Sequence, residues 1–333
     1  MPHIGRVLVT GGTGFVGKKI VSALIAAGYS VRVLARETSN TTPLADSGAE
    51  ICYGDVAEID SLTAAFGDID FVVHAAADTL GTKNGGQRVT LGGTQNVLEK
   101  CRSHNVKKLI YLSSCSVYAA AGAAKTTTID ENSPLEPRPD ERGNYSEYKL
   151  LADQLIQTHI DVSKDVPIVC LRPGLIYGHG TEVFGPTLGI NIGDKILAVI
   201  GLGRMSLPLI YVDDVADATV ECLRNNTAIN QTFNIVNAET VDKKTYINKL
   251  VRRRYDSARI IFIPYVFVFL GATVLEVIGA LLRKAPFLTR YRLSSSQTSA
   301  RFSGEKLSRL LDWRPKTSLD LAIEKMSREQ AEP

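Results

Sequence analysis

The sequence predicts an α/β fold built on a doubly wound parallel sheet. Short apolar runs alternate with helical stretches through the first half of the 333-residue chain. A glycine-rich turn joins the first apolar run to the first helical stretch. The composition, 44% hydrophobic and 22% charged, is that of an ordinary globular protein. Regular strand–helix alternation places parallel strands side by side and covers both faces of the sheet with helices.

The first strand is expected at residues 7–10 and the first helix at 15–27. Between them Gly11, Gly14 and Gly17 are spaced Gly-x-x-Gly-x-x-Gly. Glycine lets the backbone adopt positive φ or approach a ligand closely. The helix start at Phe15 and Val16 would present free N–H groups and a partial positive charge to a pyrophosphate. This turn therefore favours dinucleotide binding over an ordinary strand–helix connection.

The second strand, 31–36, bears on the kind of dinucleotide. In such folds an acid near the end of this strand binds the ribose 2′-hydroxyl, whereas an arginine accommodates a 2′-phosphate. Here Ala35 stands at the acid position and Arg36 follows it. The pattern favours NADP over NAD, and the alternative is a solvated loop arginine.

The third strand, 50–55, ends in Asp55 and Val56, which are expected at the cofactor. Asp55 would meet the adenine amino group or, equally, cap a helix predicted at 59–66. The fourth strand, 70–74, ends in His74, a residue expected to be a hydrogen-bonded core histidine. Small residues after that strand would let a cofactor lie against the backbone: Ala75, Ala76 and Ala77.

A helix is predicted at 89–101, a fifth strand at 107–112, and a further helix opening near residue 144 after a polar loop. On that helix Tyr145 and Lys149 are four residues apart and share one face. An ammonium beside a tyrosine favours the phenolate, so the tyrosine can exchange a proton with a substrate oxygen. A lone Tyr-x-x-x-Lys pair also occurs by chance on many helices.

Taken together, the motifs identify a protein family much more specifically than any one of them does. The glycine turn, Ser113–Tyr118, Tyr145–Lys149, the Arg-Pro-Gly of 172–174 and the Val-Asp-Asp of 212–214 occur in the order typical of one superfamily. The chain resembles the extended short-chain dehydrogenase/reductase superfamily over nearly its whole length, including its epimerase/dehydratase and 3β-hydroxysteroid dehydrogenase-like branches.

The resemblance implies a Rossmann-type domain over 1–178, to which 209–237 return, and a smaller substrate-binding lobe made of 179–208 and 238–333. It also implies an NAD(P)-dependent oxidoreductase whose catalytic residues are Ser114, Tyr145 and Lys149, with Ser113 and Ser116 as weaker candidates for the serine. Tyr145 would be the acid/base, and Lys149 would bind the nicotinamide ribose and lower the pKa of Tyr145. Pro173 and Gly174 would border the nicotinamide.

Three departures from the superfamily's sequence patterns reduce the number of reactions that we expect this chain to catalyse. Thr90 stands where many members have an asparagine that supports the site. Cys115 and Ser116 replace the Asp-Glu pair of the dehydratases, so dehydration is not expected. Leu207 stands where sugar-nucleotide epimerases hold a diphosphate with arginine, and an apolar side chain cannot make that contact. Arg204 is the one nearby substitute.

The net charge and the cysteine pattern argue against nucleic-acid binding, structural disulfides and a metal site. A net charge of +3 gives no argument for nucleic acid. The five cysteines are scattered without a CxxC pair, which predicts reduced thiols and no metal site. With no signal sequence ahead of the first strand, a cytoplasmic protein is expected. The resemblance makes a homodimer through the helices 89–101 and 145–160 plausible.

The stretch 260–282 is almost wholly apolar and is flanked by basic residues. Three structures compete for it: a buried helix of the substrate lobe, an interfacial helix with arginines at lipid headgroups, and a membrane span. A span would strand residues 302–315 on the far side of the bilayer. Peripheral membrane contact would suit an apolar substrate.

Three functions remain open from the sequence. The first, which the resemblance implies, is an oxidoreductase that interconverts a secondary alcohol and a ketone on a hydroxysteroid- or sterol-like or other mostly apolar ring substrate. The second is a sugar-nucleotide epimerase with tightly bound cofactor. The third is a non-catalytic NADP-binding sensor, for which the intact Ser114, Tyr145 and Lys149 are unnecessary.

Overall fold

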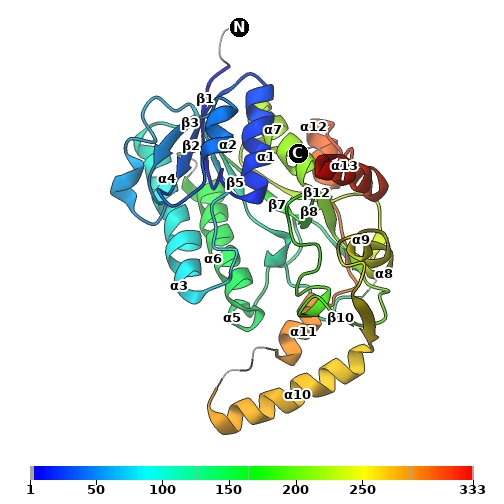
Figure 1. Cartoon of the computed structure of the whole chain (residues 1–333). Coiled ribbons are helices and arrows are strands. Elements are labelled where there is room, and N and C mark those ends of the chain that lie inside the picture. Colours follow the sequence, from blue (N-terminus) through cyan, green and yellow to red (C-terminus); the bar gives the residue numbers. More distant parts are fainter. Residues whose placement is uncertain (1–3, 125, 164, 285, 287, 332–333) are drawn as a thin grey trace.

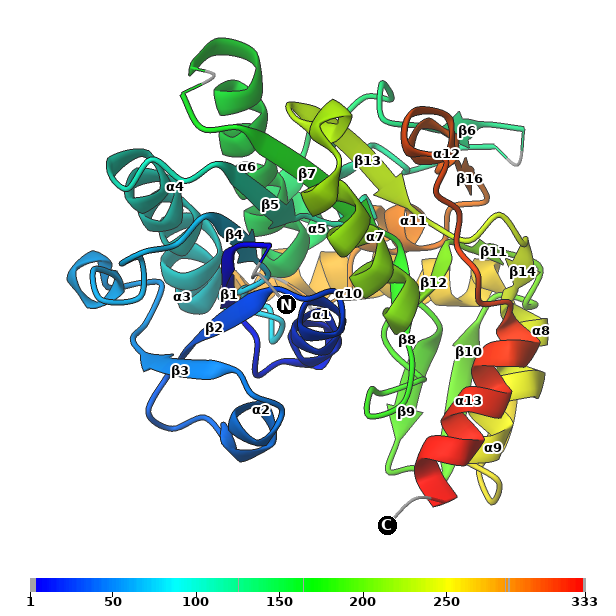
Figure 2. The ribbon, with the colours of Figure 1, turned by 90° about the horizontal axis from the view of Figure 1, so that it is seen from above.

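The computed structural model describes residues 4–124, 126–163, 165–284, 286 and 288–331. Its centre is a seven-stranded sheet in the order β3-β2-β1-β4-β5-β7-β13, with every neighbouring pair parallel (Figures 1 and 2; Figure 2 labels every strand of this sheet). The predicted doubly wound sheet is confirmed. The strand order reverses between β1 and β4, the place where such sheets open a ligand crevice at the carboxyl ends of their strands. The strands are β1 (Arg6–Thr10), β2 (Ser30–Ala35), β3 (Glu50–Tyr53), β4 (Phe71–His74), β5 (Lys108–Leu112), β7 (Ile168–Pro173) and β13 (Gln231–Ile235).

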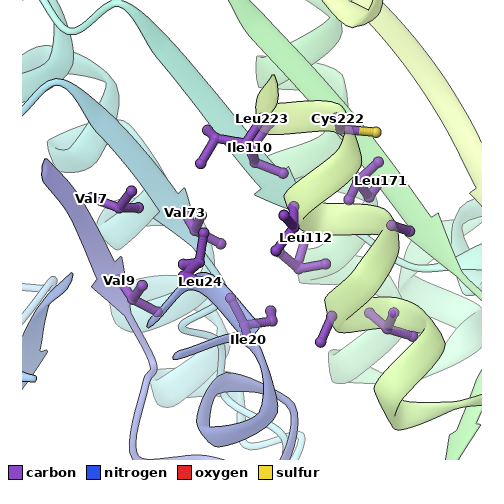
Figure 3. Close-up of a cluster of buried hydrophobic side chains, with 14 of the residues drawn as sticks. Val7, Val9, Ile20, Leu24, Val73, Ile110, Leu112, Leu171, Cys222 and Leu223 are labelled. Atoms are coloured by element: carbon purple, nitrogen blue, oxygen red, sulfur yellow. The ribbon is translucent and has the colours of Figure 1, made fainter. Parts of the chain in front are cut away.

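Helices cover both faces of this sheet because its strands are apolar on both sides. On β5, Ile110 and Leu112 pack toward α1 (Phe15–Ala26) and α7 (Val212–Arg224), as Figure 3 shows for this cluster. Leu109 and Tyr111 of the same strand face the opposite way, toward α4 (Gly93–Ser103) and α6 (Asn144–Thr158). This two-residue alternation makes the central strands buried throughout.

Two of the predicted helices differ from their expected form. The stretch 59–66 forms only a 3₁₀ turn, Ile59–Leu62. The Ser61 hydroxyl donates to the carbonyl oxygen of Glu58 at 2.7 Å and accepts from the backbone N–H of Asp55 at 3.0 Å, so side-chain bonds replace helical ones. The helix expected at 89–101 is present, but its first turns, Gly86–Gly92, are π-helical before α4 begins.

A smaller lobe with its own core lies beside the sheet (Figure 2). Its three-stranded sheet has the order β15-β10-β9, and Leu197 of β10 packs with Tyr246 and Ile323 in the lobe core. The lobe elements are β9 (Gly189–Ile192), β10 (Ile196–Ile200), α8 (Lys243–Tyr246), α9 (Arg252–Arg254), β15 (Arg259–Ile263) and α13 (Leu319–Ala331). Short strand pairs link it to the main domain: β8 (Leu175–Tyr177) with β12 (Leu209–Tyr211), β11 (Ser206–Leu207) with β14 (Val241–Asp242), and β6 (Thr128–Ile129) with β16 (Arg301–Phe302). Further short helices are α2 (Thr42–Asp46), α3 (Lys83–Gly85), α5 (Pro139–Arg142) and α11 (Arg290–Ser296).

One segment assigned to the lobe from the sequence packs elsewhere. The helix α12 (Glu305–Leu311) lies against β13, and its Leu307 and Leu311 belong to the core between the sheet and α7. Trp313 joins them and donates through Nε1 to Asp217 of α7 at 2.9 Å. Residues 305–313 are therefore part of the main domain, which corrects the expectation that the lobe takes in all of 238–333.

The apolar stretch 260–282 divides at Pro264. Its first residues complete strand β15, which pairs with β10, and the remainder forms the helix α10 (Tyr265–Leu282). Of that helix only Ala272 and Gly279 are buried, whereas Phe267 is 63% and Leu281 78% exposed. The expectation of a buried lobe helix is therefore wrong. Among the described residues α10 is the one helix long and apolar enough to cross a membrane, by length and composition.

Candidate active site

The glycine turn between β1 and α1 fits a bound pyrophosphate. Gly11 has φ +72°, and a Cβ on it would lie 2.6 Å from the backbone nitrogen of Ala76. A Cβ on Gly17 would lie 2.0 Å from the carbonyl oxygen of Gly11, so neither position tolerates a larger residue. Gly14 precedes α1 and supplies no side-chain cap, which leaves the N–H groups of the first turn available to an anion.

A buried histidine at the end of β4 links the glycine turn, through Thr10, to α4 by hydrogen bonds. His74 Nδ1 lies 2.6 Å from the Thr10 hydroxyl, and its Nε2 lies 3.1 Å from the Thr94 hydroxyl. The Thr10 hydroxyl also accepts from the backbone N–H of Ala76 at 3.4 Å. Full burial lowers the pKa of His74 to about 3, so the ring is neutral at physiological pH. The prediction of a hydrogen-bonded core histidine is confirmed.

The predicted adenosine-end residues lie at the carboxyl ends of β2 and β3. Ala35 is buried, whereas the Arg36 side chain is exposed to solvent. Asp55 does not cap a helix: its Oδ1 accepts from the backbone N–H of Ala57 at 2.9 Å in a local turn. Val56 is 5% exposed and packs in the core beneath α4, and its carbonyl oxygen accepts from the Asn96 side chain at 2.8 Å.

A cavity of about 500 Å³ opens at the carboxyl ends of the central strands, between the main domain and the lobe. Nine of the predicted site residues line it, from both the nicotinamide and the catalytic sets: Phe15, Val16, Ala75, Ala77, Ser114, Tyr145, Lys149, Pro173 and Gly174. A Cβ on Gly174 would lie 2.0 Å from the carbonyl oxygen of Pro208, so this wall requires glycine. Gly11, Gly14, Gly17, Arg36, Asp55, Val56 and Ala76 lie outside the cavity lining.

Ser114 and Tyr145 meet in this cavity. Ser114 follows β5, and its Oγ accepts from the backbone N–H of Ser116 at 3.1 Å, which holds the hydroxyl in place. Tyr145 lies in the first turn of α6 and lines the same cavity. Burial of the phenol raises the pKa of Tyr145, and the neighbouring Ser114 hydroxyl partly offsets that rise. A protonated tyrosine hydroxyl beside a serine hydroxyl can together hold a carbonyl oxygen and donate a proton to it.

Lys149 lies one turn beyond Tyr145 on the same helix. Its Nζ donates to the carbonyl oxygen of Leu112 at 2.7 Å and lies 5.5 Å from the ring centre of Tyr111. Burial lowers the pKa of Lys149 to about 8. The ammonium is thereby held at the end of β5 on the cavity wall, where it can reach a ribose. Its expected effect on the pKa of Tyr145 stays a prediction.

A buried ion-pair network lies directly behind the loop 113–118, which is called the catalytic loop for the role proposed for Ser114. The Asp153 carboxylate accepts from Arg172 through both oxygens, at 2.6 and 2.9 Å, and from the Ser113 hydroxyl at 2.5 Å. Arg172 also donates to the Tyr118 hydroxyl at 2.9 Å. Ser113 lines the cavity, but its hydroxyl donates to Asp153, which leaves Ser114 as the better candidate for the catalytic serine.

Three residues near this site are not among those that the sequence patterns predicted. Arg142 and Arg292 line the cavity, and Asp153 anchors the loop that carries Ser114. Asp153 follows Lys149 by four residues, so the helical period that paired Tyr145 with Lys149 also places Asp153 on this face. Arg142 precedes Tyr145 by three residues. No local signal places Arg292 here, since it comes from a basic run on α11.

The sequence matches a protein-family model and is similar to several known dehydrogenases. The model of the NAD dependent epimerase/dehydratase family matches residues 7–236. The sterol-4-alpha-carboxylate 3-dehydrogenase (decarboxylating) of Bos taurus is 28% identical over 340 residues, covering 98% of this chain and 93% of that protein. The 3 beta-hydroxysteroid dehydrogenase/Delta 5→4-isomerase of Mycobacterium tuberculosis is 30% identical over 255 residues, covering 72% of this chain and 67% of that protein.

Solved structures support the fold. The UDP-glucose 4-epimerase of Thermotoga maritima, solved with UDP-glucose, superposes with a TM-score of 0.73 at 18% identity. The match covers 98% of this chain and 100% of that one. The shared architecture therefore includes the lobe as well as the central sheet.

Proposed function

The chain belongs to the NAD dependent epimerase/dehydratase family and is an NAD(P)-dependent oxidoreductase of the extended short-chain dehydrogenase/reductase type; from this premise we propose that it interconverts a secondary alcohol and a ketone on a mostly apolar ring substrate of the hydroxysteroid or sterol kind. The observation that carries the proposal is the meeting of Ser114, Tyr145 and Lys149 in one largely apolar cavity.

NAD(P) bound along the glycine turn would supply or accept the hydride. The N–H groups at the start of α1 would hold its pyrophosphate, and Lys149 would hold the nicotinamide ribose. Pro173 and Gly174 form the wall against the nicotinamide side. Ser114 orients the substrate oxygen, and Tyr145 gives that oxygen a proton in reduction or takes it in oxidation.

The positions of Leu207 and Arg204 argue against the sugar-nucleotide epimerase alternative. Leu207 is 3% exposed and packs in the lobe core, so it offers nothing to a diphosphate. Arg204 is exposed and lies outside the cavity lining. The assay that separates the functions supplies a 3β-hydroxysteroid with NADP⁺ and, separately, a UDP- or GDP-sugar without added cofactor. Sugar epimerisation alone would favour the epimerase, and binding of NADPH with no turnover of any carbonyl would favour the sensor.

The proposed preference for NADP over NAD rests on Arg36, whose side chain is exposed directly after β2. That strand ends in Ala35 and so lacks the acidic residue that would bind a ribose 2′-hydroxyl. Arg36→Ala should raise the KM for NADPH about tenfold to hundredfold, because one charge-assisted bond to the 2′-phosphate is lost. The KM for NADH should change less than about threefold, since NADH carries no such phosphate. Arg328→Ala, which removes an exposed arginine on α13, is the matched control. A wild-type enzyme that prefers NADH would contradict the proposal.

Peripheral membrane contact through α10 is the localisation that we propose for an otherwise cytoplasmic protein. The helix lies apart from the central sheet, on the side of the molecule where α5 and α11 lie (Figure 1). Both its ends return to folded elements, because β15 pairs with β10 and α11 contacts α5. Arg283 and Lys284 follow the helix and are exposed, which suits anionic headgroups. An in-plane position therefore fits the fold better than a span.

The double substitution of Phe267 and Leu281 by Glu should reduce co-sedimentation with phosphatidylcholine/phosphatidylserine vesicles by at least about tenfold, since each side chain loses apolar burial in lipid. Val162→Glu, at a 76% exposed position of the main domain, should bind vesicles as the wild type does. Equal vesicle binding by all three proteins would contradict the membrane contact. If the double variant instead dissociates a dimer, α10 is an interface between two copies.

The homodimer through α4 and α6 stays a proposal that rests on the resemblance. Apart from Tyr145, none of the exposed large apolar side chains of the described residues lies on these two helices, whereas α10 carries the largest group of them. A dimer formed through α4 and α6 would therefore be held by polar contacts.

A further inference from the structure

An exposed leucine lies on the rim of the cavity that holds Ser114 and Tyr145. Thr79 lines this cavity and is exposed to solvent, so the cavity opens to the outside at the loop that contains it. The next residue, Leu80, is 87% exposed, the largest fraction among the exposed large apolar side chains of the described residues. A Cβ on Gly81 would lie 3.6 Å from the Cβ of Tyr145, so the loop adjoins the proposed acid/base residue.

The loop that carries Leu80 is held in shape by hydrogen bonds. The Asp78 carboxylate accepts from the backbone N–H of Leu80 at 3.1 Å and from that of Thr82 at 2.8 Å. The Asn144 side chain donates to the carbonyl oxygen of Gly81 at 2.8 Å. Leu80 therefore projects into solvent from a fixed turn, and its apolar surface is covered only when something apolar meets it.

The helix α10 lies on the same side of the molecule as this loop. Figure 1 shows α3, which follows Leu80, together with α5 and α11 on the side of the main domain toward α10. Glu276 of α10 accepts from the Arg290 side chain of α11 at 2.6 Å. The same short helix supplies Ser295 and Ser296 to the cavity lining, so α11 fixes α10 relative to the cavity. Two exposed apolar elements thus flank one cavity.

Both of these apolar elements have basic neighbours. Lys83 follows Leu80 by three residues, is exposed, and has no ion-pair partner in the part of the chain that the structure describes. Arg283 and Lys284 follow α10 and are exposed as well. Apolar side chains beside exposed cations suit an anionic lipid surface, where the apolar groups enter the acyl region and the cations meet the headgroups.

The charges favour a bilayer over a second copy of this chain. In a symmetric dimer the same surface patch is used on both subunits, so the cations of one copy would lie near those of the other. Anionic headgroups would instead neutralise them. A single exposed leucine is ordinary on a protein surface. Leu80 differs by lying at the cavity opening, on the side of the apolar helix.

We propose that the rim of the active-site cavity is itself a lipid-contacting surface, on which Leu80 enters a bilayer beside α10, so that an apolar substrate passes between bilayer and cavity without crossing water. This inference extends the contact through α10, and it rests on the proposed function for its apolar substrate. Moving such a molecule from lipid into water costs free energy in proportion to its apolar area. A cavity that opens on the bilayer avoids that cost.

The first test asks what covers residue 80 and needs no turnover. The one tryptophan of the chain, Trp313, is buried, so the emission that Leu80→Trp adds reports the surroundings of position 80. This emission should shift to shorter wavelength on mixing with phosphatidylcholine/phosphatidylserine vesicles, and brominated lipid should quench it. Leu321→Trp, at an exposed position of α13 away from α10, is the matched control and should show neither change (Figure 1).

The second test measures how substrate reaches the cavity. A 3β-hydroxysteroid is supplied with NADP⁺ either in the same vesicles or as a cyclodextrin complex in water. Leu80→Glu should lower kcat/KM for the vesicle-borne steroid by about tenfold, because the lipid contact of one leucine is lost. It should leave kcat/KM for the cyclodextrin complex within about twofold of the wild type, since no contact with reacting atoms changes. Leu321→Glu should match the wild type with both forms.

The possible results separate the inference from the proposals beneath it. If brominated lipid quenches Phe267→Trp on α10 but not Leu80→Trp, the bilayer meets α10 alone and the inference is overturned. An equal loss of activity in Leu80→Glu with both forms of the steroid would refute it too, because Leu80 would then act on the catalytic site. An emission shift of Leu80→Trp without vesicles, dependent on protein concentration, would assign the surface to a second copy. If the steroid is turned over in neither form, the proposed function fails, and the quenching still decides the lipid contact.

Discussion

Tyr145→Phe should lower kcat for alcohol oxidation by about 10²- to 10⁴-fold, the range that a positioned general acid or base contributes. Among the described residues that line the cavity, Tyr145 is the only tyrosine, and its hydroxyl faces the same space as Ser114. Because burial raises the pKa of Tyr145, the hydroxyl of the free enzyme is protonated at neutral pH, the form that reduction of a ketone requires. Oxidation needs the deprotonated form, so its rate should rise with pH. Steady-state kinetics in both directions measure these effects.

The matched control is Tyr148→Phe on the same helix. The Tyr148 ring packs against Gly86, where a Cβ would lie 2.1 Å from the ring, and Tyr148 does not line the cavity. This variant should keep turnover within about threefold of the wild type, since no contact with reacting atoms is lost. Cofactor affinity should be unchanged in both variants. Retained turnover in Tyr145→Phe would refute the assignment of Tyr145 as the acid/base.

Asp153→Asn should lower the free energy of unfolding by about 3–5 kcal/mol, because removing one partner leaves the buried charge of the other uncompensated. Asp153 is fully buried and Arg172 is 3% exposed, and the carboxylate takes bonds from Arg172 and from Ser113. Urea denaturation followed by circular dichroism measures the change. Activity should fall as well, because Ser113 adjoins the catalytic serine.

Asp320→Asn is the matched control for that loss. Its carboxylate pairs with Lys249 at 2.6 Å on the surface, where an ion pair is worth about 0–1 kcal/mol. The double variant Asp153→Asn with Arg172→Met should recover part of the stability, since no buried charge is then left unpaired. Equal stability of Asp153→Asn and the wild type would show that the network is not an anchor of the catalytic loop.

Several features of the fold and the site are predictable because they depend on neighbouring residues. Gly17 is required by its approach to Gly11 within one strand–helix turn, and Gly11 by its positive φ and by its approach to the backbone of Ala76, while the spacing of the two glycines is visible in the chain. Tyr145 and Lys149 share a helix face by period alone. The helix expected at 59–66 failed because Ser61 bonds locally to Asp55 and Glu58, which a reading of apolar periodicity does not weigh.

The sequence by itself predicted the doubly wound sheet, the glycine turn and the shared helix face of Tyr145 and Lys149, because each follows from local geometry and a fixed spacing, whereas the catalytic roles proposed for Ser114, Tyr145 and Lys149 come from the family resemblance. Tertiary structure alone decided what surrounds them. Arg292 contacts Glu141 across 151 residues, and the Asp153–Arg172 pair forms only once α6 packs on β7. The exposure of α10 was decided in the same way, since hydropathy specifies an apolar helix and only the packed fold determines whether anything covers it.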